Sequence, residues 1–219
     1  MDVGRLTQFP KIIWQTHNYK KEWLPTHLNQ IAATWKNLNP GWDYRYVDQV
    51  QRDQKVRQYP EIYEFYQYSM PIIQSDIWRT IVTYEEGGCY ADMDSVCVMP
   101  LDYMLESIQG DPEMITVPEN QGHGNNCNYI IKPLSPITKA VIDKISESGN
   151  FDPTNPLNTF SLFVRSAYTH PNISRSFTAA FHSSDYKKKF LAKEHEINNY
   201  GISMNYFNFV QDCGLSLTL

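Results

Sequence analysis

The amino-acid sequence predicts an α/β protein in which a β-sheet is flanked by helices. Over the first hundred residues, short runs of β-branched and aromatic residues alternate with amphipathic segments, in the order strand, helix, strand, helix, helix, strand. A hydrophobic content of 42% and an aromatic content of 14% are enough for a substantial core in a chain of 219 residues. No internal repeat or low-complexity linker divides the sequence, so we expect a single domain over residues 1–219.

The first four elements are predicted from short-range patterns. The run KIIWQ at 11–15 follows Pro10 and is rich in β-branched and aromatic residues, which indicates a buried strand. In the segment 24–38, apolar residues recur at steps of three and four, which is typical of an amphipathic helix, and the sequence NPG ends it. The alternating run at 42–48 then predicts a strand, and the segment 60–69 predicts a helix.

The segment 71–86 carries the clearest helix signal. Pro71 stands near the first helical position, and Gly87 follows the last apolar position, as is typical of a helix C-terminus. The apolar stripe consists of Ile73, Ile77, Ile81 and Tyr84. We therefore expect this helix to pack one face into the core and to lead directly into the next strand.

Beyond Pro100 the pattern is looser. Strands are expected at 114–119 and 128–133, and a helix is expected at 135–148, where isoleucine and valine recur with helical spacing. The segment 157–169 also has helical character, among polar and aromatic loops.

The composition argues against several classes of partner and location. The net charge of −5 is spread along the chain, with only a short KKK cluster at 187–189, so nucleic acid is not an expected partner. No apolar run approaches the roughly 20 residues that cross a bilayer, and residues 1–10 lack the apolar core of a signal peptide. The four cysteines show no CxxC spacing, so we expect free thiols in a reducing, cytoplasmic compartment. The sequence is also compatible with the soluble catalytic part of a larger or membrane-anchored protein.

Two aspartates interrupt the apolar run GGCYADMDSVCV at 87–98. If this run continues as a strand, its side chains alternate, so Asp92 and Asp94 share one face about 7 Å apart. Buried carboxylates need a cationic partner, and hard oxygen donors suit Mg²⁺ or Mn²⁺, which complete their shells with water and substrate phosphates. The pair therefore indicates a divalent cation and a phosphorylated ligand at the carboxyl end of a strand. Taken alone, a solvated surface turn is the ordinary alternative.

Asp76 and Arg79 form a second polar pair, three residues apart on the predicted helix 71–86. This spacing is typical of a surface ion pair that contributes little to stability. It is also compatible with a ligand site, in which the planar fork of Arg79 holds a diphosphate or a sugar hydroxyl. In that case Asp76 orients the arginine or accepts a hydrogen bond from a sugar hydroxyl.

Five blocks of the sequence resemble a known family when they are taken together. In order, they are PKIIWQTHN (10–18), NPGWDYRYVD (39–48), YPEIYEFY (59–66), PIIQSDIWRTIVTYEEGGCYADMDSVCVMPLD (71–102) and GNNCNYIIKPLSPI (124–137). Their order and spacing resemble glycosyltransferase family 32, the DXD-containing sugar transferases. That group includes fungal Golgi α-1,6-mannosyltransferases and capsular polysaccharide enzymes, and the glucosylating clostridial toxins are distant relatives. The resemblance is strongest in the fourth block.

The resemblance implies a GT-A fold, with a Rossmann-like, nucleotide-binding mixed sheet flanked by helices. The donor-binding part would span about residues 10–105, and the acceptor side would span about 106–219. The implied activity is that of a retaining hexosyltransferase, which moves a sugar from a UDP- or GDP-sugar to a glycan or glycoprotein acceptor. Mn²⁺ or Mg²⁺ is the implied cofactor.

The resemblance also implies roles for the four charged residues. Asp94 would bind the metal directly, and Asp92 would reach it through water or would contact the ribose and sugar hydroxyls of the donor. Asp76 and Arg79 would hold the donor sugar.

Other implied site residues lie in the first and last blocks. The nucleotide base would be flanked by the end of the first strand, Gln15, Thr16 and His17. Asn125 and Asn126 match the family near the reacting face of the sugar, where they either position the acceptor or close a turn.

Two departures from the family pattern leave alternatives open. The usual histidine and tryptophan are exchanged here as Trp14 and His17, so either ring is a candidate for contact with the base, and Trp14 is also a candidate core residue. The late histidine-containing segment of the family has no clear match. His182, His195 and Asp212 are the candidates there, and each is also compatible with an ordinary surface or core position.

Two other classes of function stay open. A non-catalytic carbohydrate- or nucleotide-sugar-binding module on the same scaffold would keep the donor residues without turnover. A metal-dependent phosphohydrolase would use the same aspartates, but the sequence shows no further histidine or aspartate cluster of the two-metal type.

Overall fold

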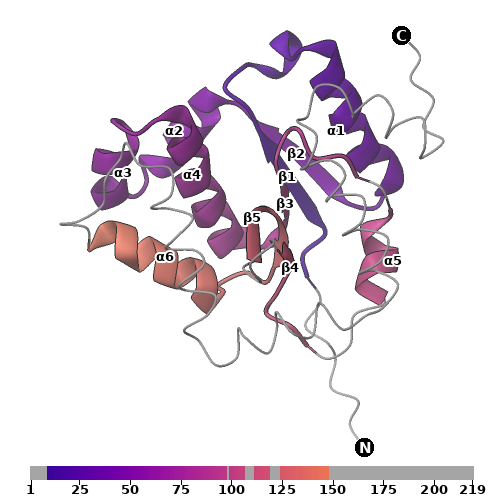
Figure 1. Ribbon diagram of the computed structural model, residues 1–219. Coiled ribbons are helices and arrows are strands. Elements are labelled where there is room, and N and C mark those ends of the chain that lie inside the picture. Colours follow the sequence, from indigo (N-terminus) through magenta and orange to yellow (C-terminus); the bar gives the residue numbers. More distant parts are fainter. Residues whose placement is uncertain (1–8, 98, 107–110, 119–123, 148–219) are drawn as a thin grey trace, which may run out of the picture.

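Five strands form one mixed sheet in the computed structural model, which describes residues 9–97, 99–106, 111–118 and 124–147. The strands are β1 (Ile12–Thr16), β2 (Asp43–Val47), β3 (Gly88–Ala91), β4 (Met114–Pro118) and β5 (Gly124–Ile131). Their order across the sheet is β2-β1-β3-β5-β4. The first three strands run parallel, whereas β5 is antiparallel to both of its neighbours. The expected α/β fold with a mixed sheet is confirmed (Figure 1).

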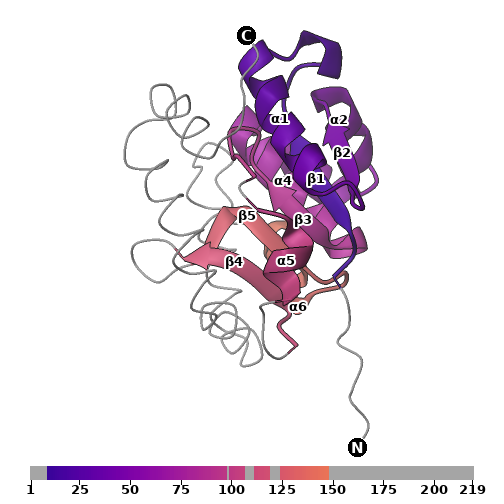
Figure 2. The ribbon, with the colours of Figure 1, turned by 90° about the vertical axis from the view of Figure 1, so that its right-hand side faces the viewer.

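Helices cover both faces of this sheet (Figures 1 and 2). One face is covered by α1 (Thr26–Leu38) and α5 (Leu101–Glu106). The other face is covered by α2 (Gln49–Val56), α3 (Pro60–Tyr66), α4 (Pro71–Glu86) and α6 (Pro136–Ser146). A short 3-10 helix, η1 (Lys21–Trp23), precedes α1. Among the described residues, no helix combines the length and the apolar character that crossing a bilayer requires.

The central strands divide their side chains between two hydrophobic cores. Trp14 and Tyr90 face the core under α2, α3, α4 and α6. Ile13 and Cys89 face the opposite core, where they pack with Trp35 of α1. Because successive side chains of a strand alternate between faces, a sheet covered on both sides buries nearly every residue of its central strands. All four residues of β3 are accordingly buried.

The helix α4 follows the pattern expected from the sequence. Ile73, Ile77 and Ile81 have no exposed surface, Pro71 lies in the first turn, and Gly87 ends the helix with a positive φ of 65°. The Gly87 N–H donates to a carbonyl one turn back in α4, which closes the helix before the chain enters β3.

The sequence pattern does not predict α2 or α5. Both are short, and α2 offers few apolar residues, so its periodicity is weak. The local signal for α2 is a capping box: the Asp48 carboxylate accepts from the Gln51 N–H, and the Gln51 side chain accepts from the Asp48 N–H. The predicted strand at 128–133 begins earlier, at Gly124, and the predicted helical segment 157–169 lies outside the described residues.

The strand β3 ends at Ala91, so the expectation that Asp92 and Asp94 alternate within a strand is wrong. The Ser95 N–H donates to the Asp92 carbonyl at 3.0 Å, and the Gln15 side-chain amide donates to the same carbonyl at 3.0 Å. Because this carbonyl is occupied by a turn and by a side chain, the chain leaves the sheet at this point. Both aspartates therefore lie in a turn just beyond the carboxyl end of β3.

We expect Gly88→Ala to lower the free energy of unfolding by about 2 kcal/mol or more. Gly88 has a φ of +96°, and a Cβ atom there would lie 2.7 Å from the Ile12 carbonyl oxygen in the neighbouring strand. The control is Gly41→Ala, because a Cβ atom at Gly41 meets no atom within 4 Å. Urea denaturation measures both changes, and equal losses in the two variants would contradict the argument.

Candidate functional site

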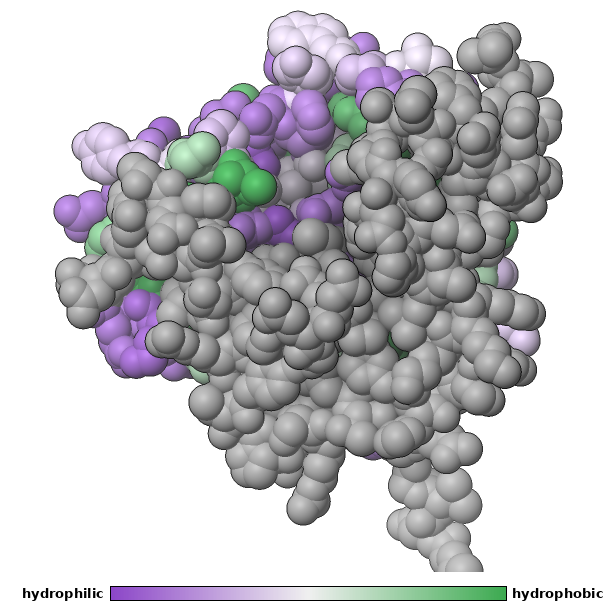
Figure 3. Space-filling model, in the orientation of Figure 1, coloured by the Kyte–Doolittle hydropathy of each residue, from purple (hydrophilic) through white to green (hydrophobic). Residues whose placement is uncertain are grey.

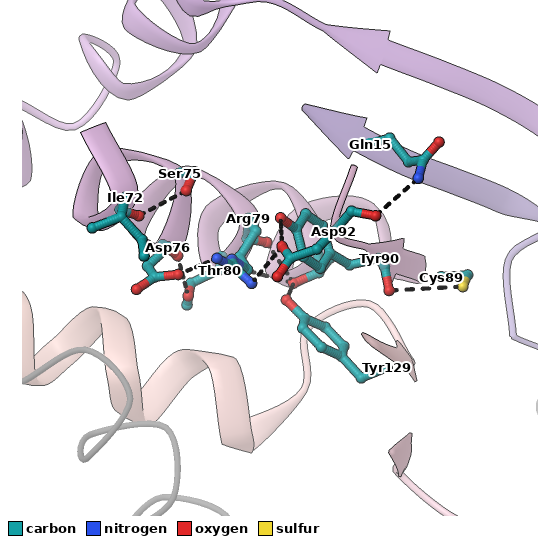
Figure 4. A network of polar contacts seen from close by, with 11 residues as sticks. Gln15, Ile72, Ser75, Asp76, Arg79, Thr80, Cys89, Tyr90, Asp92 and Tyr129 are labelled. Atoms are coloured by element: carbon teal, nitrogen blue, oxygen red, sulfur yellow. Dashed lines mark hydrogen bonds and ion pairs between the residues drawn. The ribbon is translucent and has the colours of Figure 1, made fainter. Parts of the chain in front are cut away.

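A cluster of charged side chains lies where α4 meets the end of β3 (Figure 4). Arg79 of α4 forms an ion pair with Asp76 one turn earlier, and its Nη1 donates to Asp92 Oδ1 at 3.2 Å. The Tyr90 hydroxyl donates to the same Asp92 oxygen at 2.6 Å, and the Arg79 guanidinium lies over the Tyr90 ring at 4.4 Å from the centroid. One guanidinium thus joins a carboxylate of the helix to a carboxylate of the turn.

The cluster is buried at its helical end and open at the turn. Asp76 is 5% exposed and Arg79 is 4% exposed, whereas the Asp92 side chain keeps 27% of its surface. Burial raises the pKa of Asp76 to about 6; Arg79 opposes this rise, and the charge of Asp92 adds to it. On the face seen in Figure 3, the described side chains that border the central hollow are mainly hydrophilic.

Asp94 lies two residues further along the turn and is half-buried. Burial raises its pKa, and the neighbouring charge of Asp92 raises it further. Within the described part of the chain, the Asp94 carboxylate has no hydrogen bond from another residue and no ion pair. A carboxylate in this state is stabilised by a cation placed beside it.

The turn offers oxygen ligands that fit Mg²⁺ or Mn²⁺. The Asp94 carboxylate is bonded only by its own backbone N–H within the described ranges. Asp92 Oδ2 has no bond there, since Arg79 and Tyr90 both use Oδ1. The described residues contain no group of three or more His, Cys, Asp or Glu side chains placed to hold a metal. Mg²⁺ commonly binds through one or two carboxylates and takes its remaining ligands from water and substrate phosphates, so two aspartates are a sufficient protein contribution.

The end of β1 supports the turn from the side. Gln15 has no exposed surface: its Nε2 donates to the Asp92 carbonyl, and its Oε1 accepts from the Tyr44 hydroxyl at 2.8 Å. The Thr16 hydroxyl donates to the Val47 carbonyl at 2.7 Å and joins β1 to β2. Gln15 and Thr16, two of the three residues expected to flank the base, therefore use their side chains to fix the backbone at Asp92 and Val47.

The two candidate rings of β1 lie in different environments. Trp14 is 4% exposed, donates to the Gly87 carbonyl at 2.9 Å and packs edge-on against Trp78, so its reading as a core residue is confirmed. His17 is half-buried, and its Nδ1 accepts from the Tyr19 N–H at 3.2 Å. His17 is thus the ring that stays partly open at this edge.

The late asparagines lie in β5, so the alternative that they close a turn is wrong. Ala91 pairs with Asn128 in an antiparallel ladder, so the backbone of Asn125 and Asn126 continues past the end of β3. This register places their backbone at the edge of the sheet where the acidic turn begins. His182, His195 and Asp212 lie outside the described residues.

Sequence reasoning missed Tyr90. The signal was available in its position two residues before Asp92, because residues two apart in an extended chain point to the same side. Tyr90 also packs beside Tyr129 of β5, with ring centroids 5.6 Å apart, and the Tyr129 hydroxyl lies 3.1 Å from the Thr83 hydroxyl of α4. The acidic turn is therefore built on a packed layer of tyrosines.

Comparison with known proteins identifies the region that contains this cluster. Residues 25–112 match the family described as "Glycosyltransferase sugar-binding region containing DXD motif". The initiation-specific α-1,6-mannosyltransferase of Candida albicans is 30% identical over 121 residues, which are 52% of this chain and 30% of the relative. HOC1 of Saccharomyces cerevisiae is 30% identical over 100 residues, which are 43% of this chain and 24% of the relative. The chain thus matches less than a third of the length of each of these relatives.

A solved structure shares the fold. The PaToxG glycosyltransferase aligns with a TM-score of 0.55 at 15% sequence identity, over 94% of this chain and 85% of that chain. At this identity the likeness concerns the fold alone, and it agrees with the mixed sheet and its helical layers. The fold is GT-A, and the family resemblance expected from the sequence is confirmed: residues 25–112 are similar to the DXD-containing sugar-binding region of glycosyltransferases.

Proposed function

We propose that this protein is a metal-dependent retaining hexosyltransferase that moves a sugar from a UDP- or GDP-sugar to a glycan or glycoprotein acceptor. The proposal rests on one observation: two of the three aspartates are bound by Arg79, and the third is left to bind a cation. Arg79 binds Asp76 and Asp92, while the Asp94 carboxylate has no partner on another residue in the described part of the chain. The family match over residues 25–112 supports the same reading. The donor part would span about 10–105, and the acceptor side about 106–219, which includes Asn125 and Asn126.

The buried pair on α4 is suited to hold the donor sugar. Asp76 is an acceptor in a poorly hydrated position, where a hydrogen bond from a sugar hydroxyl is electrostatically stronger than in water. Arg79 fixes the orientation of that carboxylate, and its second contact sets the distance between Asp76 and Asp92. The sugar would therefore meet acceptor groups whose positions are set before it binds.

Asp94 and Asp92 Oδ2 would hold the Mn²⁺ or Mg²⁺. A bound ion of this kind neutralises the charge that develops on a departing diphosphate. The protein fixes the turn by the Ser95 N–H and the Gln15 amide, which both bind the Asp92 carbonyl. His17, at the end of β1, is the described ring suited to flank the base.

We expect Asp94→Asn to weaken the binding of UDP or GDP in the presence of Mn²⁺ by about a hundredfold, as charge at the metal is lost. Calorimetry with and without Mn²⁺ measures the effect. The matched control is Asp43→Asn, which removes the same charge from an exposed position on β2. Equal affinity in the Asp94 variant and the wild type would refute the metal assignment.

Incubation with a panel of nucleotide sugars and Mn²⁺ separates transfer from the two other classes. A transferase without its acceptor is expected to release free sugar slowly, because water takes the place of the acceptor. Binding of nucleotide without any release from the common donors would favour a binding module. Release of inorganic phosphate would favour a phosphohydrolase.

The raised pKa of Asp76 predicts a pH dependence of stability in the absence of ligand. The folded protein retains a proton on Asp76 up to about pH 6, whereas the unfolded chain releases it near the ordinary pKa of an aspartate, 3.8. The free energy of unfolding should therefore fall as the pH rises from about 4 to 6, by at most about 1.4 kcal/mol per pH unit. Above about pH 6, the contribution of Asp76 to the free energy of unfolding should no longer change with pH. Urea denaturation from about pH 4 to 6 should show a shallower slope in Asp76→Asn. Identical slopes in variant and wild type would contradict the assignment.

A further inference from the structure

A second buried arginine, Arg52 of α2, lies outside the cluster around Arg79. It is 1% exposed; its Nη2 donates to Asn18 Oδ1, and its Nε is buried without a hydrogen-bond partner. Burial lowers the pKa of Arg52, but a guanidinium stays protonated in proteins. The interior therefore holds a positive charge whose hydrogen-bonding capacity is only partly used.

No carboxylate of the described residues forms an ion pair with Arg52. Asp53, next to it on α2, accepts the Tyr66 hydroxyl at 2.6 Å, and its charge reaches Arg52 only at longer range. Arg79 and Arg45, by contrast, each bind two carboxylates. An unpaired buried charge destabilises the folded state, so the stability of the fold alone does not account for an arginine at position 52.

The hydrogen bond from Arg52 determines how Asn18 is oriented. Arginine has donors only, so the Asn18 oxygen must face inward, and the two amide N–H groups must face away from Arg52. Asn18 is exposed and follows the carboxyl end of β1. A hydrogen-bond donor group, backed by a buried positive charge, is thus presented at this edge of the sheet.

The backbone that carries Asn18 is fixed on both sides. The His17 N–H donates to the Val47 carbonyl at 3.3 Å, and the Tyr19 N–H donates to the His17 ring. The Tyr46 hydroxyl donates to the Tyr19 carbonyl. The loop is thereby held to β2, so the amide of Asn18 has a defined position before any ligand arrives.

Charge is arranged differently along the two halves of this edge of the sheet. The half at β3 carries Asp76, Asp92 and Asp94 against one arginine, whereas in the half at β1 the buried Arg52 forms no ion pair with a described carboxylate and Asp53 acts on it only at longer range. Ligands of open α/β sheets gather at the carboxyl ends of the strands. A nucleoside diphosphate sugar that spans this edge would offer sugar hydroxyls and metal-bound phosphate oxygens to the β3 half, and further phosphate oxygens to the β1 half.

We propose that Asn18 binds a phosphate oxygen of the donor nucleotide through its amide N–H groups, and that Arg52 is the positioning residue that orients and polarises it. This assignment rests on the proposed function and extends it, since the donor anion supplies the directly paired counter-charge that Arg52 does not find among the described residues. Neither residue takes part in the ion-pair cluster of α4 and β3.

The decisive variant is Asn18→Asp, which keeps the shape of the side chain. It removes the N–H donors, adds a charge that repels phosphate, and gives Arg52 a carboxylate partner. We expect the ligand-free protein to be at least as stable as the wild type, and its affinity for UDP or GDP with Mn²⁺ to fall by about tenfold or more. The affinity for the matching nucleoside, which lacks phosphate, should stay within about twofold.

Matched variants separate this role from a structural one. Asn37→Asp makes the same chemical change at an exposed position on α1 and should leave both affinities unchanged. Arg52→Met removes the buried charge at similar volume and should weaken diphosphate binding while nucleoside binding is retained; Arg52→Lys should restore part of the loss.

Calorimetry of the diphosphate and of the nucleoside supplies the readout for every variant. Unchanged diphosphate affinity in Asn18→Asp would overturn the assignment. An equal loss of affinity for nucleoside and diphosphate would also overturn it, because it would place the contact at the base or ribose. Wild-type protein that binds no nucleoside diphosphate would refute the proposed function itself. The two failures are therefore distinguishable.

Discussion

The contact of one guanidinium with two carboxylates organises this molecule. Arg79 binds Asp76 within α4 and Asp92 beyond β3, so it joins a helix to the turn that follows the adjacent strand. The positive charge of Arg79 reduces the electrostatic repulsion between these two aspartates and so allows them to lie close together. The Tyr90 hydroxyl and ring complete the contact from below. Without this bridge, no cation of the described residues would hold the two carboxylates in place at the position where a polar ligand can bind them.

The backbone around this bridge depends on where β3 begins and ends. Gly87 and Gly88 permit the sharp passage from α4 into the strand, because both have positive φ and lie against neighbouring backbone. At the other end, Gln15 binds the carbonyl of Asp92 and so takes the place of a ladder hydrogen bond. A strand of only four residues between these two limits fixes the distance from the helix end to the acidic turn. The geometry of the cluster is therefore a consequence of the sheet.

The sequence predicts the long elements well because their signals are local and repeated. The isoleucine stripe of α4, its proline and its terminal glycine agree with one another, and the structure confirms them. The acidic turn was misread as strand because the pattern contains no information on which neighbour takes the Asp92 carbonyl; that depends on Gln15, 77 residues away. Arg52 was missed for a related reason. Its helix is short and its burial comes from tertiary packing, so only the capping box at Asp48 marks the element.

The unequal distribution of charge along the edge of the sheet would let this acidic protein receive the anionic donor that is proposed for it. A net charge of −5 and three aspartates near the site would repel a diphosphate if they acted uniformly. Within the described residues, however, the carboxylates of the site stand on the β3 side, where hydroxyls and a cation are suited to meet them. On the β1 side, Arg52 is buried and forms no ion pair with a carboxylate of the described residues, so water screens its charge only weakly. Under the proposed function, this difference would orient a donor that bridges the two sides, since a donor bound the other way round would place its phosphates against Asp76 and its sugar against Asn18.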